Sequence, residues 1–69
     1  MDKLFNQLTK LLEPDKAELV DFDELIGTYS RRKVDAAAKQ LDELEQAGLL
    51  TYQREDYGFR IKMNKKSPL

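Results

Sequence analysis

The hydrophobic pattern of this chain changes its period once, at Gly48. Before this glycine, apolar residues between positions 34 and 44 recur every three or four residues, which indicates one buried face of an α-helix. After it, apolar side chains at positions 50 and 52, and again at 59, 61 and 63, alternate with polar ones, which indicates two half-buried strands. The segment Glu55-Asp56-Tyr57-Gly58 between the two runs predicts a hairpin turn. The second half of the chain is therefore expected to be a long helix followed by a β-hairpin.

Two shorter helices are predicted in the first half. Residues 2–12 place leucines and a phenylalanine on one helical face, with Asp2 as N-cap and Pro14 just beyond the end. A second helix starts at Asp21 or Phe22 and ends around residues 27–29, where glycine permits a turn. Residues 15–20 between these helices fit either a short strand or an extended connector.

The composition limits the chemistry that the chain can carry. The 69 residues include no Cys and no His, which excludes disulfides, Cys or His metal ligands, and the usual catalytic bases and nucleophiles. A metal site made of carboxylates alone, such as Asp21, Asp23 and Glu24, is conceivable, but the preference of helix first turns for acids explains those residues more simply. We expect neither an enzyme nor a cofactor. We expect a single domain over residues 1–64 and a flexible tail over residues 65–69. No apolar run approaches the ~20 residues of a membrane span, and we expect a cytoplasmic protein.

Charge is distributed unevenly along the chain. Residues 1–30 hold three cations and seven anions, whereas residues 31–69 hold nine cations and six anions. The cations Arg31, Arg32 and Lys33 follow Ser30, a good N-cap for the long helix over residues 30–47. Positive charge opposes the helix dipole at this end, so a purely structural helix gains little from it, while a helix that meets a polyanion gains more.

Helical geometry sorts the side chains of this long helix by face. The apolar stripe lies in one sector and consists of Val34, Ala37, Ala38, Leu41 and Leu44. The opposite face consists of Arg32, Ala36, Lys39 and Glu43. Arg31 and Asp35 lie on one edge between the two faces, and Lys33 lies on the other edge.

The order of these elements resembles a winged helix-turn-helix domain over nearly the whole chain. The resemblance is carried by Phe22-Asp23-Glu24-Leu25-Ile26, by the turn Gly27-Thr28-Tyr29-Ser30, and by a helix end, Gly48 and an apolar pair leading into a strand. It implies a mostly α, α+β fold: three helices followed by a two-stranded β-hairpin wing.

The resemblance also implies a small DNA-binding protein, such as a transcriptional or plasmid/phage-type regulator. The third helix would then lie in the major groove of double-stranded DNA, with Arg32, Ala36 and Lys39 toward the bases. Arg31 and Lys33 would clamp phosphates, and Ser30 would both cap the helix and donate to a phosphate. On the wing, Arg54, Arg60 and Lys62 would follow the phosphate backbone.

Some residues favour a different partner. Asp35 and Glu43 lie on or beside the expected reading face, and Glu55 and Asp56 occupy the wing tip, where a basic residue is expected. With the acidic first half, they favour an alternative in which the same fold is a protein-interaction module, an adaptor or anti-repressor. A homodimer through the first helix is also possible, and its residues would be Leu4, Phe5, Leu8 and Leu11. The simpler role of these side chains is to close the core.

Overall fold

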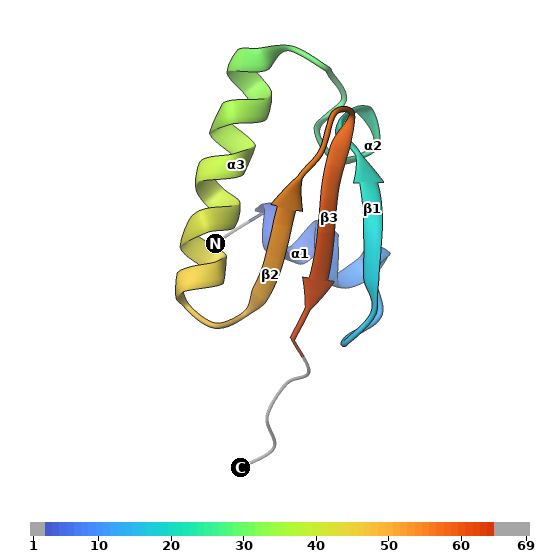
Figure 1. The fold of residues 1–69 in the computed structure, drawn as a ribbon, viewed down its shortest axis with the longest axis vertical. Helices are drawn as coiled ribbons and strands as arrows, with labels where there is room; N and C mark the ends of the chain where they lie inside the picture. The colour runs from blue at the N-terminus through green and yellow to red at the C-terminus, as the bar shows by residue number, and fades with distance from the viewer. Residues whose placement is uncertain (1–2, 65–69) are drawn as a thin grey trace.

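The computed structural model describes residues 3–64 and shows three helices and a three-stranded antiparallel sheet (Figure 1). Asp2 and the predicted tail, residues 65–69, lie outside the described residues. The fold class is α+β, as expected. In chain order, the elements are α1 (Lys3–Leu11), β1 (Ala17–Asp21), α2 (Phe22–Ile26), α3 (Arg31–Gln46), β2 (Leu50–Arg54) and β3 (Gly58–Met63).

The sheet corrects the expectation of a two-stranded hairpin alone. β2 and β3 form the predicted hairpin, and the Glu55 N–H donates to the Gly58 carbonyl (2.8 Å) to close its turn. A third strand, β1, pairs with the other edge of β3, so the strand order is β1-β3-β2. Most of the ambiguous segment 15–20 is therefore strand.

Gly58 is the residue on which the pairing of β1 with β3 depends most directly. It lies opposite Asp21, and a Cβ placed on it would be 2.4 Å from the carbonyl oxygen of Val20. At the same end of the strand, the Phe22 N–H donates to the Tyr57 carbonyl (2.8 Å). The backbones approach so closely here that only glycine fits without movement.

Local signals set the helix ends. Asp21 caps α2, because its carboxylate accepts from the Asp23 N–H (2.8 Å). α2 ends at Ile26, before the expected limit, because Gly27 follows in the left-handed conformation (φ 75°). α3 ends as predicted before Gly48, which has φ 80°, and the Leu49 N–H donates to the Leu44 carbonyl (3.0 Å) in a Schellman arrangement.

The core lies between the helices and one face of the sheet. Along β3, Phe59, Ile61 and Met63 are buried while Arg60 and Lys62 are exposed, so the helices cover the first face and leave the other open. The predicted stripe of α3 is confirmed: Ala38 is partly buried, and the other four residues are buried. Phe22 and Phe59 meet edge to face, with ring centroids 5.0 Å apart. None of the helices in the described part of the chain is long and apolar enough to cross a membrane.

α1 contributes to this core with the residues that were considered for a dimer. Leu8 is fully buried and Leu4 is 7% exposed, so both pack inside their own chain. Phe5 is partly buried against the same core, and Leu11 is 43% exposed. Leu4 and Leu8 therefore close the core, and of the four residues considered for a dimer Leu11 is the exposed one.

Candidate nucleic-acid interface

The outer face of α3 presents the predicted reading residues to solvent. Arg32, Ala36, Lys39 and Glu43 are all exposed, as are Arg31 and Lys33 at the two edges. Within residues 3–64, the ion pairs are Arg54–Asp35 and Arg60–Glu55, so the four cations of α3 keep their charges uncompensated by a salt bridge.

The charges of α3 run in the order that the helix dipole disfavours. All four cations lie in the first nine residues of the helix, and Asp42, Glu43 and Glu45 lie in its second half. The first turn has no acid and the last turn has no base. A helix dipole favours the reverse arrangement at both ends, by about 0.3–1 kcal/mol for each exposed charge.

Ser30 occupies the N-cap position of α3, but its side chain does not cap the helix. Its carbonyl accepts the Val34 N–H (2.8 Å), and its own N–H donates to the Thr28 hydroxyl (3.0 Å). Ser30 is therefore at the predicted N-cap position, but the capping hydrogen bond expected from its side chain is absent. The N-terminus of α3 thus carries three cations and no side-chain cap.

Two side chains of β2, Tyr52 and Arg54, attach it to α3 through polar contacts that the sequence did not predict. The Tyr52 hydroxyl lies 2.5 Å from the Asp42 carboxylate and 3.2 Å from the Ala38 carbonyl. Arg54 forms an ion pair with Asp35, with 2.8 Å between Nη1 and Oδ1. Asp35 and Asp42 are two helical turns apart, and Tyr52 and Arg54 are alternate residues of one strand, so each pair of side chains points to one side of its own element.

Burial and the contact with Asp42 raise the pKa of Tyr52 to about 12. The hydroxyl therefore stays protonated, and able to donate, through the neutral range of pH. Of these two β2 side chains, Tyr52 is the more buried, and its contact with the Ala38 carbonyl is partly buried, whereas the side chains of the Arg54–Asp35 pair are 43% and 56% exposed.

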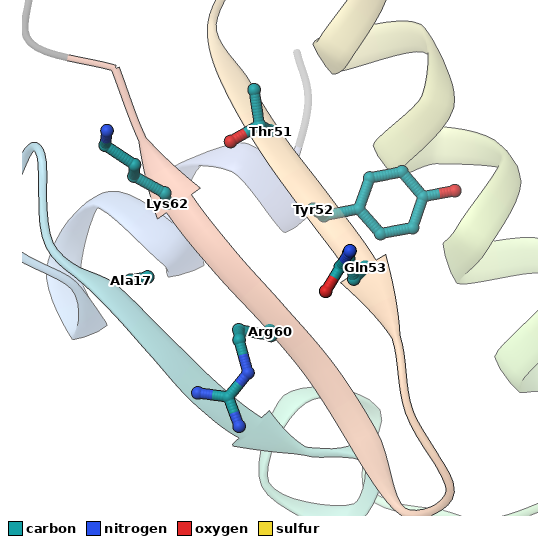
Figure 2. A pocket seen from close by; sticks show the side chains of 6 residues that line it. All are labelled: Ala17, Thr51, Tyr52, Gln53, Arg60 and Lys62. Atoms are coloured by element: carbon teal, nitrogen blue, oxygen red, sulfur yellow. The ribbon is translucent and has the colours of Figure 1, made fainter.

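Arg60 and Lys62 lie on the open face of the sheet, away from the helices. They line a shallow hollow of about 370 Å³ together with Ala17, Thr51, Tyr52 and Gln53 (Figure 2). Arg60 donates to Glu55 from Nε (2.8 Å), and Glu55 raises the pKa of the Arg60 guanidinium. The nine predicted interface residues therefore do not form one surface: Ser30, the cations of α3, Ala36 and Arg54 lie on the helical side, whereas Arg60 and Lys62 lie across the sheet.

An aromatic cluster fixes the loop that precedes α3. Tyr57 is 71% exposed and contacts the Tyr29 ring edge to face (centroids 6.5 Å apart). Tyr29 also packs against Phe22 (6.3 Å), and its hydroxyl donates to the Asp21 carboxylate (2.6 Å). This hydrogen bond lowers the pKa of Asp21. It is also the largest cause of the rise in the pKa of Tyr29 to about 12. The hairpin turn, the start of α2 and the approach to α3 are thereby joined.

The chemistry that this side of the molecule offers is anion recognition: guanidinium and ammonium donors around an uncapped helix N-terminus. Among residues 3–64, no group of three His, Cys, Asp or Glu side chains is arranged to hold a metal ion. Searches against protein-family models, curated proteins and solved structures each found no match for this chain.

Proposed function

We propose that this chain is a winged helix-turn-helix protein that binds duplex DNA with the first half of α3. The observation that carries the proposal is the charge order of α3, with four cations in its first nine residues and three acids in its second half. This order lowers helix stability, so it needs another reason. A polyanion at the N-terminal half supplies one, because phosphates gain from both the cations and the helix N-terminus.

The dimensions of α3 suit a DNA groove. Its sixteen residues make a rod roughly 24 Å long and about 10–12 Å across, and the major groove is about 12 Å wide. In this placement, Arg32 and Lys39 reach base edges, while Ala36 allows close approach and contacts a thymine methyl. Arg31 and Lys33 contact the phosphates on either side. The Ser30 hydroxyl, which makes no capping bond, donates to a phosphate.

The arrangement of the elements supports the winged-helix part of the proposal. α2 and α3 are joined by the four-residue segment Gly27-Thr28-Tyr29-Ser30, and β2 leads back from α3 into the hairpin. The hairpin turn lies near the N-terminal end of α3 (Figure 1), which is where a wing would approach DNA. A small regulator of transcription, or a plasmid or phage protein, is the role that fits such a domain.

A protein-interaction module is the second candidate. The observation that favours it is the pairing of Glu55 with Arg60, which leaves the hairpin with little net positive charge for phosphates. The exposed Tyr29 and Tyr57 beside this turn are residue types common in protein interfaces.

Fluorescence titration of labelled duplex DNA at several salt concentrations tests the proposal. The proteins are the wild type, the double variant Arg32→Ala/Lys39→Ala, and Lys62→Ala as a matched control on the far face of the sheet. We expect wild-type binding that weakens with salt, weaker binding by the double variant, and little change in the control. The salt slope of the double variant should be shallower by about 0.9 for each of its two replaced side chains that also neutralises a phosphate. A wild type that does not bind duplex even at low salt, or a control as impaired as the double variant, would leave the interaction module as the better candidate.

A further inference from the structure

The ion pair between Arg54 and Asp35 joins the end of β2 to the edge of α3. Arg54 is the last residue of β2, beside the hairpin turn, and its Nη1 lies 2.8 Å from the Asp35 carboxylate. Asp35 lies one helical turn after Arg31 and one turn before Lys39. One carboxylate thus lies on the same stretch of surface as three cations, two of which the proposed function assigns to DNA.

We propose that Arg54 is a masked phosphate-binding residue: Asp35 occupies its guanidinium, and loss of that carboxylate would add one phosphate contact to the α3 surface. This inference rests on the proposed function. It follows from the position of Arg54, whose side chain is on the helical face of the sheet, unlike Arg60 and Lys62 on the open face.

The pair is built to compete with a phosphate. An exposed pair of this kind is weak, because both side chains are about half exposed to water. A phosphate that bound Arg54 would replace the Asp35 carboxylate as its partner, so one anion would be exchanged for another. Because Asp35 is fixed to the helix, its carboxylate would then remain unpaired beside the DNA backbone. Little counterion release is gained by that exchange, so Arg54 adds little to DNA affinity while Asp35 is charged.

Asp35 accordingly limits the part of DNA affinity that does not depend on sequence. Phosphate contacts are the same on every duplex, and they supply nearly all non-specific binding. With Asp35 in place, the phosphate contacts come from the cations of α3. Without it, the edge of β2 would join them.

The test compares the wild type with Asp35→Asn, Arg54→Gln and the double variant Asp35→Asn/Arg54→Gln on a random-sequence duplex between 50 and 200 mM salt. Glu43→Gln is the control, because it removes an exposed acid of α3 that has no ion pair within residues 3–64. Thermal unfolding of each variant verifies that the fold is retained.

We expect Asp35→Asn to steepen the salt slope by about 0.9, which makes its advantage over the wild type roughly three- to fourfold larger at 50 mM than at 200 mM salt. This gain should shrink when Arg54 is also replaced, and Glu43→Gln should give a smaller gain. An equal gain in Glu43→Gln, or a gain that persists without Arg54, overturns the inference while leaving the proposed function standing. A wild type that does not bind duplex DNA overturns both.

Discussion

Replacing Gly58 with alanine tests whether β1 is bound to β3 as tightly as the structure shows. The new Cβ would lie 2.4 Å from the Val20 carbonyl oxygen, 3.0 Å from the Val20 carbonyl carbon and 3.1 Å from the Asp21 Cα. A comfortable carbon–oxygen contact is about 3.3 Å or more, so the strands must separate by roughly 1 Å. All three neighbours are backbone atoms, which have no alternative rotamer to adopt.

The expected loss of stability can be estimated from the cost of overpacking. Forcing extra volume into a packed site costs typically about 1–3 kcal/mol, and the upper part of that range applies where backbone must move. For a domain of this size, about 2–3 kcal/mol corresponds to a fall in Tm of roughly 10–20 °C. Thermal and urea unfolding measure the loss, and amide hydrogen exchange should show β1 losing protection before β2.

The other glycines provide matched controls with a different cause. Gly27 has φ 75° and nothing within 4 Å of an added Cβ, so its alanine variant costs only the left-handed backbone, about 1–2 kcal/mol. Asparagine tolerates that conformation, so Gly27→Asn should recover part of the loss. Gly58→Asn should be no better than Gly58→Ala, because its difficulty is space. A Gly58→Ala protein within about 0.5 kcal/mol of wild type, the range of an ordinary surface change, would refute the close pairing of β1 with β3.

Three further outcomes are expected. Lys33→Glu should stabilise the fold by about 0.5–1 kcal/mol, because it replaces a cation in the first turn of α3 with an acid, and it should weaken duplex binding; thermal unfolding and DNA titration check both signs. Leu8→Ala should cost about 2–5 kcal/mol because Leu8 is fully buried, whereas Leu11→Ala should cost about 0.5 kcal/mol or less in the same urea unfolding assay. The folded-state pKa of Tyr52 is raised from 10.0 to about 12. The stability that this raised pKa contributes is therefore complete below pH 10 and is lost as the pH rises toward 12. In thermal unfolding over a series of pH values, Tyr52→Phe should lose less stability than the wild type in that range.

The elements that the sequence predicted well are those with long, regular patterns. α3 offers a stripe of five apolar residues with a glycine stop, and β3 alternates from Phe59 to Met63. β1 has no comparable signal, because Val20 is its only buried residue and Leu19 is 49% exposed. Its place in the sheet comes from pairing with a strand some forty residues later and from the absence of a side chain at Gly58. A local pattern of apolar residues does not predict a pairing partner so distant in the sequence.

The interface residues were predicted from their types and spacing, and the structure shows which of them lie together. The helical wheel placed Arg32, Ala36 and Lys39 correctly on an exposed face, because helix geometry alone decides it. It gave no information on the partner of Asp35, which lies nineteen residues away on β2, or on the side of the sheet that Arg60 occupies. Asp35 counted against DNA binding in the sequence, and in the fold it forms an ion pair with Arg54.

The cations of α3 are a stronger indication of function because most other features of the helix favour its stability. Its stripe is buried, its C-terminus closes with a Schellman arrangement, and its β2 edge is fixed by Tyr52 and Asp42. The distribution of charge departs from what a stable helix prefers at both ends, and the N-terminus also lacks a side-chain cap. Sequences tend to break one local rule where a site needs it and to keep the others. If Lys33→Glu stabilises the fold and leaves duplex binding unchanged, this departure has no functional cause in DNA, and the proposed function loses the observation that carries it.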